Sequence, residues 1–460
     1  MLFHSTNKKS ATRELNERSS RRMTATRELN ERSSRRMTKK VSFREALMSG
    51  LADDGGLFLP DSFPRLSGSF LKGLGRKSFQ EIAFEVSRKF IRDIPDRDLK
   101  RIISDSFGFE VPVRKISGKT YVLELWHGPT LAFKDFGARF MARLMSHYLR
   151  EDRKVLNIVV ATSGDTGSAV AAGFYGLPNI NVFVLYPSGR VTDLQEKQMA
   201  TPGKNITAIE VRGSFDDCQK MAKQILSDRN LAGRIRLSSA NSINFGRLLP
   251  QSFYYWSAFA EMRKSGVKQF SFCVPSGNFG NLTAGLIAKR MGMDVSQFIA
   301  ATNSNDIVPR YLDTGRFVSR VSRRTISNAM DVGNPSNFAR ISEMFHGNVK
   351  KMRKEILGIS VSDKQTRETI RNVYRETKYV VDPHTAVGIA AVQEAGVSRP
   401  VVVLSTAHPS KFRETVEPVI KKKIKLPKQL SSIVNRKNKS VMMDADPEQL
   451  KKLILKKNSA

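Results

Sequence analysis

Short apolar runs alternate with helix-length segments over most of the chain from Tyr121 onward. Between two of these runs, Phe136, Phe140 and Leu144 recur at helical spacing. Strands that alternate with helices are typical of parallel sheets covered by helices on both faces, so the pattern predicts an α/β fold. The strands are expected at residues 121–125, 155–161, 182–186, 206–211, 269–274, 298–302 and 401–405.

The segment before these strands has a different pattern. Residues 42–48 are amphipathic, residues 53–56 carry a turn signal, and residues 78–90 show helical periodicity. The length of the chain indicates more than one packed unit. We expect an N-terminal subdomain over 41–115, an α/β region of two lobes over 116–427, and a basic C-terminal segment over 428–460.

An exact tandem repeat precedes the subdomain. The sequence ATRELNERSSRRMT stands at 11–24 and again at 25–38. An exposed tail tolerates such an insertion more readily than a folded core does. The repeat is polar and rich in Arg and Ser, which predicts a disordered basic tail over residues 1–40. An organelle transit peptide is the functional alternative, although the glutamates of the repeat argue against it.

The composition is that of a globular protein, since 40% of the 460 residues are hydrophobic and 26% are charged. The longest apolar runs, such as residues 156–162, are strand-sized and far shorter than a bilayer span. No secretory h-region stands near the amino terminus. Cys218 and Cys273 lie in separate segments, and the histidines are scattered without metal-ligand spacing. We therefore expect a cytoplasmic protein with no membrane segment, no disulfide and no metal site.

The net charge of +34 is the unusual property of this composition, because it attracts polyanions non-specifically. The two ends of the chain are the most basic parts, at residues 1–40 and 411–460. Basic clusters such as residues 421–423 are not interleaved with aromatic residues, as a nucleic-acid platform would require. We interpret the charge as a solvated surface and expect no specific nucleic-acid partner. A polyanion-binding protein built on an enzyme fold is the alternative.

A lysine bracketed by apolar residues is the strongest chemical signal. Lys134 lies at the start of a helical pattern, with Leu131, Phe133 and Phe136 around it. An amine held against such side chains loses hydration, and its pKa falls. A neutral, positioned amine is what Schiff-base chemistry with an aldehyde cofactor requires. A buried stem with a solvated amine is the alternative interpretation.

Two glycine-rich loops follow predicted strands. Residues 276–281 (SGNFGN) stand between a strand and a helical pattern, where backbone N–H groups at a helix start can bind a phosphate. Residues 161–168 (ATSGDTGS) form a polar nest suited to a carboxylate or a phosphate. The first loop matches neither a Walker sequence nor a GxGxxG fingerprint. An ordinary tight turn is the alternative for the first loop, and simple helix capping for the second.

Two further segments carry polar groups after predicted strands. Residues 239–246 set amide and hydroxyl groups before Arg247, which can clamp an anion if a helix begins near Ser242. A surface arginine beside a helix cap explains the same residues equally well. Thr406 follows the strand at 401–405, where a hydroxyl can meet a ring nitrogen of a cofactor. His408 is interpreted as structural, since no nucleophile pattern accompanies it.

Five ordered motifs resemble the threonine synthase family, pyridoxal-phosphate-dependent lyases of the tryptophan-synthase-β-like fold type. The resemblance runs from about Val41 to about Pro427 and leaves out the repeat. It implies fold type II, with two parallel-rich α/β lobes, the cofactor in the cleft between them, and an N-terminal subdomain. The motifs are HGPTLAFKDFGARFMA (127–142), ATSGDTGSAVA (161–171), SANSIN (239–244) with Arg247, VPSGNFGNLTAG (274–285) and TAHPSKF (406–412).

The resemblance also implies roles for individual residues. Lys134 would form the Schiff base with pyridoxal phosphate and act as the catalytic base, and Thr406 would face the pyridine nitrogen. Asp165 would contact the phenolic oxygen of the cofactor, where many relatives carry asparagine. The cofactor phosphate would be surrounded by Gly277, Asn278, Phe279, Gly280 and Asn281. The substrate would be bound by Thr162, Ser163, Gly164, Thr166, Asn241, Ser242 and Arg247.

The implied reaction converts O-phospho-L-homoserine and water to L-threonine and phosphate, the last step of threonine biosynthesis. A related phospho-lyase that yields ammonia and a keto acid is the enzymatic alternative. We expect the chain to act on this small molecule as a monomer or a homodimer.

Overall fold

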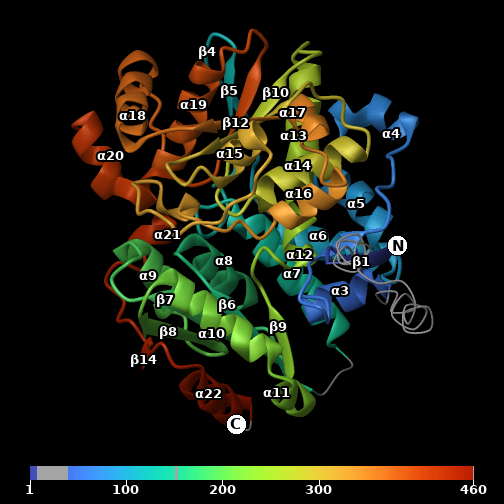
Figure 1. Ribbon diagram of the computed structural model, residues 1–460, viewed down its shortest axis with the longest axis vertical. Helices are drawn as coiled ribbons and strands as arrows, with labels where there is room; N and C mark the ends of the chain where they lie inside the picture. The colour runs from blue at the N-terminus through green and yellow to red at the C-terminus, as the bar shows by residue number, and fades with distance from the viewer. Residues whose placement is uncertain (8–39, 151–153, 459–460) are drawn as a thin grey trace, which may run out of the picture.

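The computed structural model describes residues 1–7, 40–150 and 154–458. These residues form three sheets, and helices cover the two larger ones. Figure 1 shows the six-stranded sheet in the upper lobe, the five-stranded sheet in the lower lobe, and the N-terminal part beside them. All seven predicted strands are present, so the predicted α/β fold is confirmed.

The larger lobe contains a six-stranded sheet in the order β12-β11-β10-β13-β5-β4. Neighbouring strands are parallel except at β4, which is an antiparallel edge strand. The strand β12 is not among the predicted ones, because Gly358 interrupts its apolar run. A Cβ on Gly358 would lie 2.7 Å from the Cα of Pro309, so close packing excludes a larger residue. The strands are β4 (Val113–Ser117), β5 (Thr120–Glu124), β10 (Ser271–Pro275), β11 (Phe298–Thr302), β12 (Ile356–Ser360) and β13 (Val401–Ser405).

The smaller lobe contains a five-stranded, fully parallel sheet in the order β14-β8-β7-β6-β9. Its central strand β7 is buried along nearly its whole length, as expected for a strand covered by helices on both faces. The C-terminal segment contributes the edge strand β14 and the helix α22 (Pro447–Asn458) to this lobe. The strands are β6 (Leu156–Ala161), β7 (Ile180–Pro187), β8 (Ile206–Arg212), β9 (Arg236–Ser239) and β14 (Val441–Asp444).

The N-terminal part corrects the predicted tail over residues 1–40. The strand β1 (Leu2–Ser5) pairs antiparallel with β2 (Val41–Ser42) and β3 (Phe58–Pro60). Phe3 is completely buried, and its ring centroid lies 4.8 Å from that of Phe245. A four-residue strand is defined by its partners and not by its own pattern, which is why it escapes prediction. The tandem repeat itself lies outside the described residues.

The helical signals of the N-terminal subdomain are confirmed. Ser42 and Ser78 each close a capping box at the start of a helix, with Glu45 and Glu81 respectively. The helices α5 and α6 pack on α13 and α7, so this subdomain rests on helices that also cover the lobes. Its helices are α3 (Phe43–Ser49), α4 (Gly68–Gly73), η1 (Leu74–Arg76), α5 (Phe79–Phe90) and α6 (Asp96–Ser106).

The remaining helices connect the strands of the two lobes, and one hydrophobic core continues from the N-terminal subdomain into both. Between β5 and β10 they are α7 (Lys134–Tyr148), α8 (Asp165–Phe174), α9 (Asp193–Ala200), α10 (Phe215–Ser227), α11 (Arg229–Arg234), α12 (Phe245–Leu248) and α13 (Gln251–Lys264). After β10 they are α14 (Gly280–Arg290), α15 (Ile307–Thr314), η2 (Asn328–Met330), α16 (Phe338–Met344), α17 (Val349–Glu355), α18 (Asp363–Thr377), α19 (Pro383–Ala395), η3 (Pro409–Phe412), α20 (Arg413–Ile420) and α21 (Lys428–Ser431).

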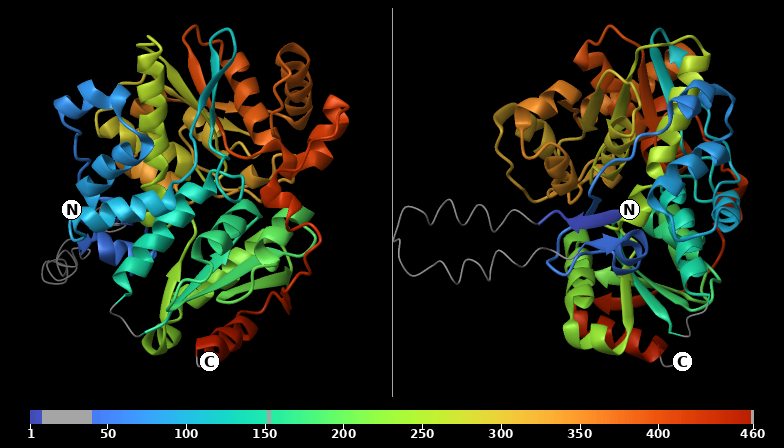
Figure 2. Two further views of the ribbon diagram at one scale, coloured as in Figure 1. Left: turned by 180° about the vertical axis from the view of Figure 1, so that it is seen from behind. Right: turned by 90° about the vertical axis from the view of Figure 1, so that its right-hand side faces the viewer.

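The chain passes between the lobes several times. It leaves the larger lobe after β5, builds the smaller lobe from β6 to β9, and returns to the larger lobe with β10. After α20 it descends once more, and Figure 2 shows this last segment running along the side of the molecule to β14. Lys439 anchors the segment, because its backbone N–H donates to the carbonyl of Ala200 at 2.7 Å. Each lobe therefore depends on both early and late parts of the chain.

Over the ranges that the structure describes, no helix combines the length and the apolar character needed to cross a bilayer. Within the same ranges, no group of three His, Cys, Asp or Glu side chains is arranged to hold a metal ion. Cys218 and Cys273 are both buried free thiols.

Candidate active site

Lys134 lies where the two lobes meet. It is the first residue of α7, and the turn before it is bound to the end of β13. The backbone N–H of Phe133 donates to the carbonyl of Thr406 at 2.8 Å, and Ala132 forms an isolated bridge with Ala407. Lys134 and Thr406 are thus neighbours in space, as the sequence predicts for a lysine and a ring-facing hydroxyl of one site.

The turn before Lys134 is built around a buried carboxylate. Asp135 accepts a hydrogen bond from the backbone of Thr130 and another from its hydroxyl, both at 2.8 Å. A Cβ on Gly128 would lie 2.4 Å from the Asp135 carboxylate, so only glycine fits there. Burial raises the pKa of Asp135 to about 6, against the opposing effect of these hydrogen bonds. The GPTLAFKD sequence therefore folds into one fixed turn that presents Lys134.

The amine of Lys134 lies beside an aromatic ring. Its Nζ lies 4.6 Å from the centroid of the Phe133 ring and forms no ion pair with the described residues. Burial, followed by the charge of Arg247, lowers the pKa of Lys134 to about 8, and the carboxylate of Asp165 opposes this shift. The predicted depression of the lysine pKa is reproduced, and its main physical cause is the expected loss of hydration.

The turn at 276–281 has the geometry of a phosphate cradle. Phe279 adopts a left-handed conformation, with φ of 58°, immediately before α14 begins at Gly280. The backbone N–H groups of the first turn of α14 have no intrahelical acceptor. A Cβ on Gly277 would lie 2.8 Å from the Cα of Met330, so the backbone approaches closely there. These features leave a ring of N–H donors at a positive helix end.

Asn281 supplies an additional donor to this cradle. Its Oδ1 accepts hydrogen bonds from the hydroxyls of Tyr254 and Tyr255, at 2.6 and 2.8 Å. Its Nδ2 is buried and has no hydrogen-bond partner among the residues that the structure describes. Tyr254 also packs on Phe136 of α7, with ring centroids 5.1 Å apart. The two tyrosines therefore fix Asn281 with an unused N–H group and connect the cradle to the helix that begins with Lys134.

Ser242 links the predicted substrate-phosphate loop to the cradle. Its hydroxyl accepts hydrogen bonds from the side chains of Asn278 and Asn337, at 2.9 and 3.1 Å. Asn278 in turn accepts a hydrogen bond from the backbone of Ser336 at 2.6 Å. The sequence segments SANSIN, SGNFGN and GNPSN are thus joined by side-chain hydrogen bonds in one network.

Arg247 is buried, and no acidic residue in the described part of the chain forms a hydrogen bond with it. It lies in the short helix α12, and its Nη1 donates to the carbonyl of Ala240. Its Nε has no hydrogen-bond partner within the described ranges, and the backbone of Gly137 packs against the guanidinium. Burial lowers the pKa of Arg247 to about 10, against the opposing charge of Asp135. A buried guanidinium with unused donors beside Lys134 is suited to an anionic ligand.

Asn241 has a different position from the one that the sequence suggests for a ligand contact. Its side chain forms two hydrogen bonds with the backbone of Ala161, one from Nδ2 to the carbonyl at 2.7 Å and one accepted from the N–H at 3.3 Å. Both polar atoms of the amide are therefore occupied. Asn241 ties the SANSIN segment to the end of β6, and its direct contact with a phosphate stays a prediction.

The loop after β6 is organised by its first threonine. The hydroxyl of Thr162 accepts hydrogen bonds from the N–H groups of Gly164 and Gly167, at 2.9 and 2.8 Å. Ser163 and Thr166 keep part of their surface exposed. Ser163 lines a cavity of about 440 Å³ together with residues of the larger lobe such as Asp331 and Phe412. The loop therefore opens toward the space between the lobes, where a substrate can enter.

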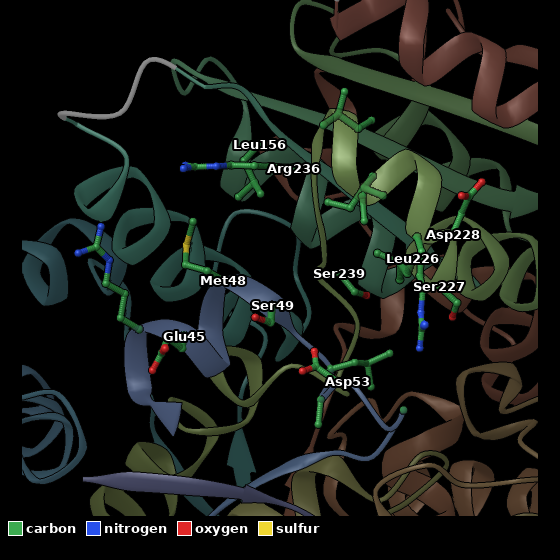
Figure 3. A pocket seen from close by; sticks show the side chains of 18 of the residues that line it. Glu45, Met48, Ser49, Asp53, Leu156, Leu226, Ser227, Asp228, Arg236 and Ser239 are labelled. Atoms are coloured by element: carbon green, nitrogen blue, oxygen red, sulfur yellow. The ribbon is translucent and has the colours of Figure 1, made fainter. Parts of the chain in front are cut away.

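A larger cavity, of about 960 Å³, lies elsewhere. It is lined by α3, by the end of α10 and by β9, and Figure 3 shows Glu45 and Met48 on one side of it with Leu226 and Ser227 on the other. None of the predicted site residues line this cavity. Size alone does not mark the active site, because the chemistry lies at the strand ends.

Several residues that sequence reasoning passed over complete the site. Asp382 contacts His384, with Oδ2 and Nδ1 2.7 Å apart, and Nε2 of His384 accepts the N–H of Ala329 at 3.2 Å. Arg340 is fully buried and donates to the carbonyls of Phe58, Ser242 and Ile243. Burial lowers the pKa of Arg340 to about 9. Residues 327–331 (SNAMD) and 333–337 (GNPSN) supply partners in these contacts, through the N–H of Ala329 and the side chain of Asn337.

The carboxylate of Asp165 binds two side chains. Its Oδ1 accepts hydrogen bonds from Nζ of Lys411 at 2.7 Å and from Nε2 of Gln195 at 2.9 Å. Neither partner is a predicted site residue, although Lys411 belongs to the TAHPSKF motif. Whether Asp165 also contacts a cofactor stays a prediction.

The site fits a cofactor that combines a phosphate, a ring and an aldehyde. The cradle offers backbone N–H groups, the orphaned Nδ2 of Asn281 and a glycine where no side chain fits, and the amine of Lys134 has a lowered pKa. The family model described as pyridoxal-phosphate dependent enzyme matches residues 111–406. The fold and the site thus define a pyridoxal-phosphate enzyme of fold type II.

Narrower comparisons give the family. The models for the threonine synthase N terminus and C-terminal region match residues 32–107 and 385–454. Threonine synthase of Escherichia coli (strain K12) is 41% identical over 91% of this chain and 97% of its own length. The PLP-bound threonine synthase structure from Brucella melitensis is 34% identical with a TM-score of 0.87, covering 92% of this chain and 98% of its own. The yeast threonine synthase structure is 32% identical with a TM-score of 0.84, covering 99% and 98%. The chain belongs to the threonine synthase family, which confirms the resemblance.

Proposed function

We propose that this chain converts O-phospho-L-homoserine and water to L-threonine and phosphate, with Lys134 as the cofactor-binding lysine and catalytic base. The observation that supports these roles is the position of Lys134, whose pKa is lowered by burial and by the charge of Arg247 and whose preceding turn is bound to Thr406. When bound, pyridoxal phosphate supplies an aldehyde for amines and a ring that withdraws electrons from the carbons of the substrate.

The cofactor phosphate would lie in the cradle at residues 277–281. The side-chain N–H of Asn281 would gain the acceptor that it lacks among the described residues, so its desolvation would be compensated. Thr406 would present a hydroxyl to the ring nitrogen. A hydroxyl does not hold a proton on that nitrogen as a carboxylate would, so the ring would be a moderated electron acceptor.

The substrate would bind through its two anionic ends. The loop from Thr162 to Thr166 would receive the carboxylate, and Ser242 with Arg247 would receive the phosphate. Arg247 would also stabilise the phosphate as it leaves, because a buried guanidinium interacts strongly with developing charge. Asn241 would support this site indirectly, by holding the segment at 239–244 against the end of β6.

Lys134 would move the protons. With its pKa near 8, a larger fraction of this amine is neutral at physiological pH than for an ordinary lysine. The neutral amine would take the proton from Cα of the substrate and then from Cβ. Water adds at Cβ after the phosphate has left Cγ, and the same amine would return protons to complete threonine.

A direct assay tests this function. Protein loaded with pyridoxal phosphate should release phosphate and threonine from O-phospho-L-homoserine in equal amounts. Lys134→Ala should abolish both products and the visible absorption of the bound cofactor. Lys72→Ala, on an exposed position of α4, is the matched control and should keep full activity. Wild-type turnover by Lys134→Ala would remove Lys134 from the mechanism, and ammonia with a keto acid would identify the alternative phospho-lyase.

Other properties expected from the sequence stay predictions. They are the cytoplasmic location, the monomeric or dimeric state and the absence of a specific nucleic-acid partner. Sedimentation of the purified protein and its elution from heparin at increasing salt would test the last two.

A further inference from the structure

A second buried lysine lies in the active site and has no part in the steps above. Lys411, in η3, is 1% exposed. Its Nζ lies 2.7 Å from Oδ1 of Asp165 and donates to the carbonyl of Thr130 at 3.0 Å. Thr130 belongs to the turn that presents Lys134. Both partners of Lys411 are therefore parts of the site, and neither is a surface group.

Asp165 is engaged at one carboxylate oxygen. Oδ1 receives the hydrogen bonds from Lys411 and Gln195, whereas Oδ2 receives none from the described residues. Asp165 is 6% exposed, and its charge acts on Lys134. The free oxygen is the part of the carboxylate that is left for a ligand at the amine.

The pair joins the two lobes. Lys411 follows β13 of the larger lobe, whereas Asp165 begins α8 and Gln195 lies in α9 of the smaller lobe. The packing between α8 and α9 is tight, because a Cβ on Gly164 would lie 2.4 Å from the side chain of Gln195. Contacts from both lobes therefore fix the position of the carboxylate.

Lys411 decides the charge of Asp165. Burial by itself raises the pKa of this carboxyl, but the charge and hydrogen bond of Lys411, together with Gln195, lower the pKa of Asp165 overall. A buried carboxylate that loses the cation bonded to it takes up a proton more readily. With both partners in place the pair has no net charge, which is also true of an asparagine side chain at the same position.

We propose that Lys411 is a positioning residue of the reaction, which keeps Asp165 ionised and oriented toward the bound cofactor and Lys134 while it cancels the charge of the carboxylate. The inference rests on the proposed function of the site, but it concerns residues to which that function assigns no step. It predicts that the lysine and the aspartate act as one unit, so that losing both lowers kcat much less than the two single losses multiplied together.

A double-mutant cycle tests this coupling. The variants are Lys411→Met, Asp165→Asn and the two combined, each loaded with pyridoxal phosphate. Each single variant is expected to lower kcat by about tenfold or more, since it leaves a buried charge or an unpaired carboxyl. The kcat of the double variant should be at least about tenfold higher than the value obtained by multiplying the two single losses. Losses that simply multiply would overturn the proposal.

The pH dependence separates charge control from simple support. In Lys411→Met the unpaired Asp165 should take up its proton at a higher pH than in the intact protein and add a transition to the visible absorption of the bound cofactor. The intact protein and the double variant should lack this transition. The other ionisable groups that act on the pair are Lys134, His384, Asp135 and His408, and they are the same in all four proteins. A Lys411→Met profile that matches the intact protein would overturn the proposal.

Two further variants guard against a folding effect. Lys451→Met removes an amine that pairs with Asp228 at the same 2.7 Å but on the partly exposed surface, and it should change neither kcat nor the absorption profile. Gln195→Met removes the neutral hydrogen bond to the same oxygen and should add no new transition. If Lys411→Met does not fold, Gln195→Met still tests the proposal. A new pH-dependent absorption transition in Gln195→Met would overturn it. A stable Gln195→Met without this transition would support the charge of Lys411 as the cause.

The absorption titration needs no substrate. A coupled pair in a protein that makes no threonine would therefore uphold the role of Lys411 and reject the proposed function. If the protein makes threonine but the two single losses of kcat multiply in the double variant, the proposed function would stand and the role of Lys411 would be rejected.

Discussion

The two glycine-rich loops of the site begin alike and are stabilised differently. Each follows a buried parallel strand and leads into a helix, from β10 to α14 and from β6 to α8. Side chains of other elements hold the turn at 276–281, since Ser242 binds Asn278 and two tyrosines bind Asn281. The backbone of the loop at 162–167 is organised from within, by the hydroxyl of Thr162, and the side chains of Lys411 and Gln195 bind the Asp165 carboxylate.

This difference matches what each loop has to bind. A turn fixed from outside keeps its shape whether or not a ligand is present, which suits a cofactor that stays through many turnovers. A loop fixed from within keeps partly exposed hydroxyls at Ser163 and Thr166, which suits a substrate that enters and leaves. We therefore expect substitutions in the turn to act on cofactor binding and those in the loop to act on KM.

Replacing the orphaned donor of the turn should have the largest effect. Asn281→Asp puts a carboxylate oxygen where a phosphate needs an N–H, in a buried position. The dissociation constant for pyridoxal phosphate should rise by about a hundredfold or more. Titration of the cofactor-free protein, followed by visible absorption, measures it. Asn435→Asp, at an exposed position, is the control, and an affinity for Asn281→Asp within threefold of the control would contradict the phosphate cradle.

The amine between the two loops should be reactive at moderate pH. Only the neutral amine is acylated, so its labelling rate rises with pH and levels off above the pKa. In cofactor-free protein the labelling rate of Lys134 should reach half of its maximum near pH 8. An ordinary lysine reaches half of its maximum at about pH 10.4, so below pH 8 the two rates should differ by roughly a hundredfold. Peptide mass spectrometry after brief acylation at several pH values measures this. A midpoint above pH 10 would show that the amine is fully hydrated.

Loosening the loop from within should affect the substrate and spare the cofactor. Thr162→Val keeps the shape of the side chain but removes the acceptor of two backbone N–H groups. We expect KM for O-phospho-L-homoserine to rise by about tenfold, while the affinity for pyridoxal phosphate stays unchanged. Steady-state kinetics and cofactor titration provide the two values. Thr207→Val on β8 is the control, and an equal loss of both affinities would erase the distinction between the loops.

The smallest effect is expected at Ser163, a partly exposed residue of the loop at 162–167. Ser163→Ala removes one partly exposed hydroxyl that has no described hydrogen-bond partner. KM should rise by about threefold, and the thermal unfolding temperature should not change, since no internal bond is lost. Kinetics and calorimetry on the same sample test this. A lower unfolding temperature would mean that Ser163 supports the fold and not the ligand.

The parts of the fold that sequence predicts well are those in which one segment carries its own signal. The seven predicted strands are apolar runs that the sheets bury. The strand β9, in contrast, contains Arg236 and two serines, and it is defined by its pairing with β6. The same holds for β1 and β14, which are short and belong to sheets whose other strands lie far away in the chain.

The site divides in the same way. Loops with glycine and hydroxyl residues could be found from the sequence because their function depends on local backbone shape. Their supporting partners could not be found, because only the folded chain brings them together. Gln195 is 30 residues from Asp165, and Lys411 is 281 residues from Thr130. Phe279 belongs to the predicted cradle, but its left-handed backbone has no signal in a phenylalanine.

The late arrival of β14 has a consequence for how the chain is made. The strand β8 ends at Arg212, and its partner β14 begins only at Val441. At roughly 5–20 residues per second, a ribosome leaves this sheet edge open for about 10–50 s. An open edge can pair with another nascent chain. The charged side chains of Glu210 and Arg212 mark this edge, and Arg212 meets Asp444 at 2.9 Å once the correct strand has emerged.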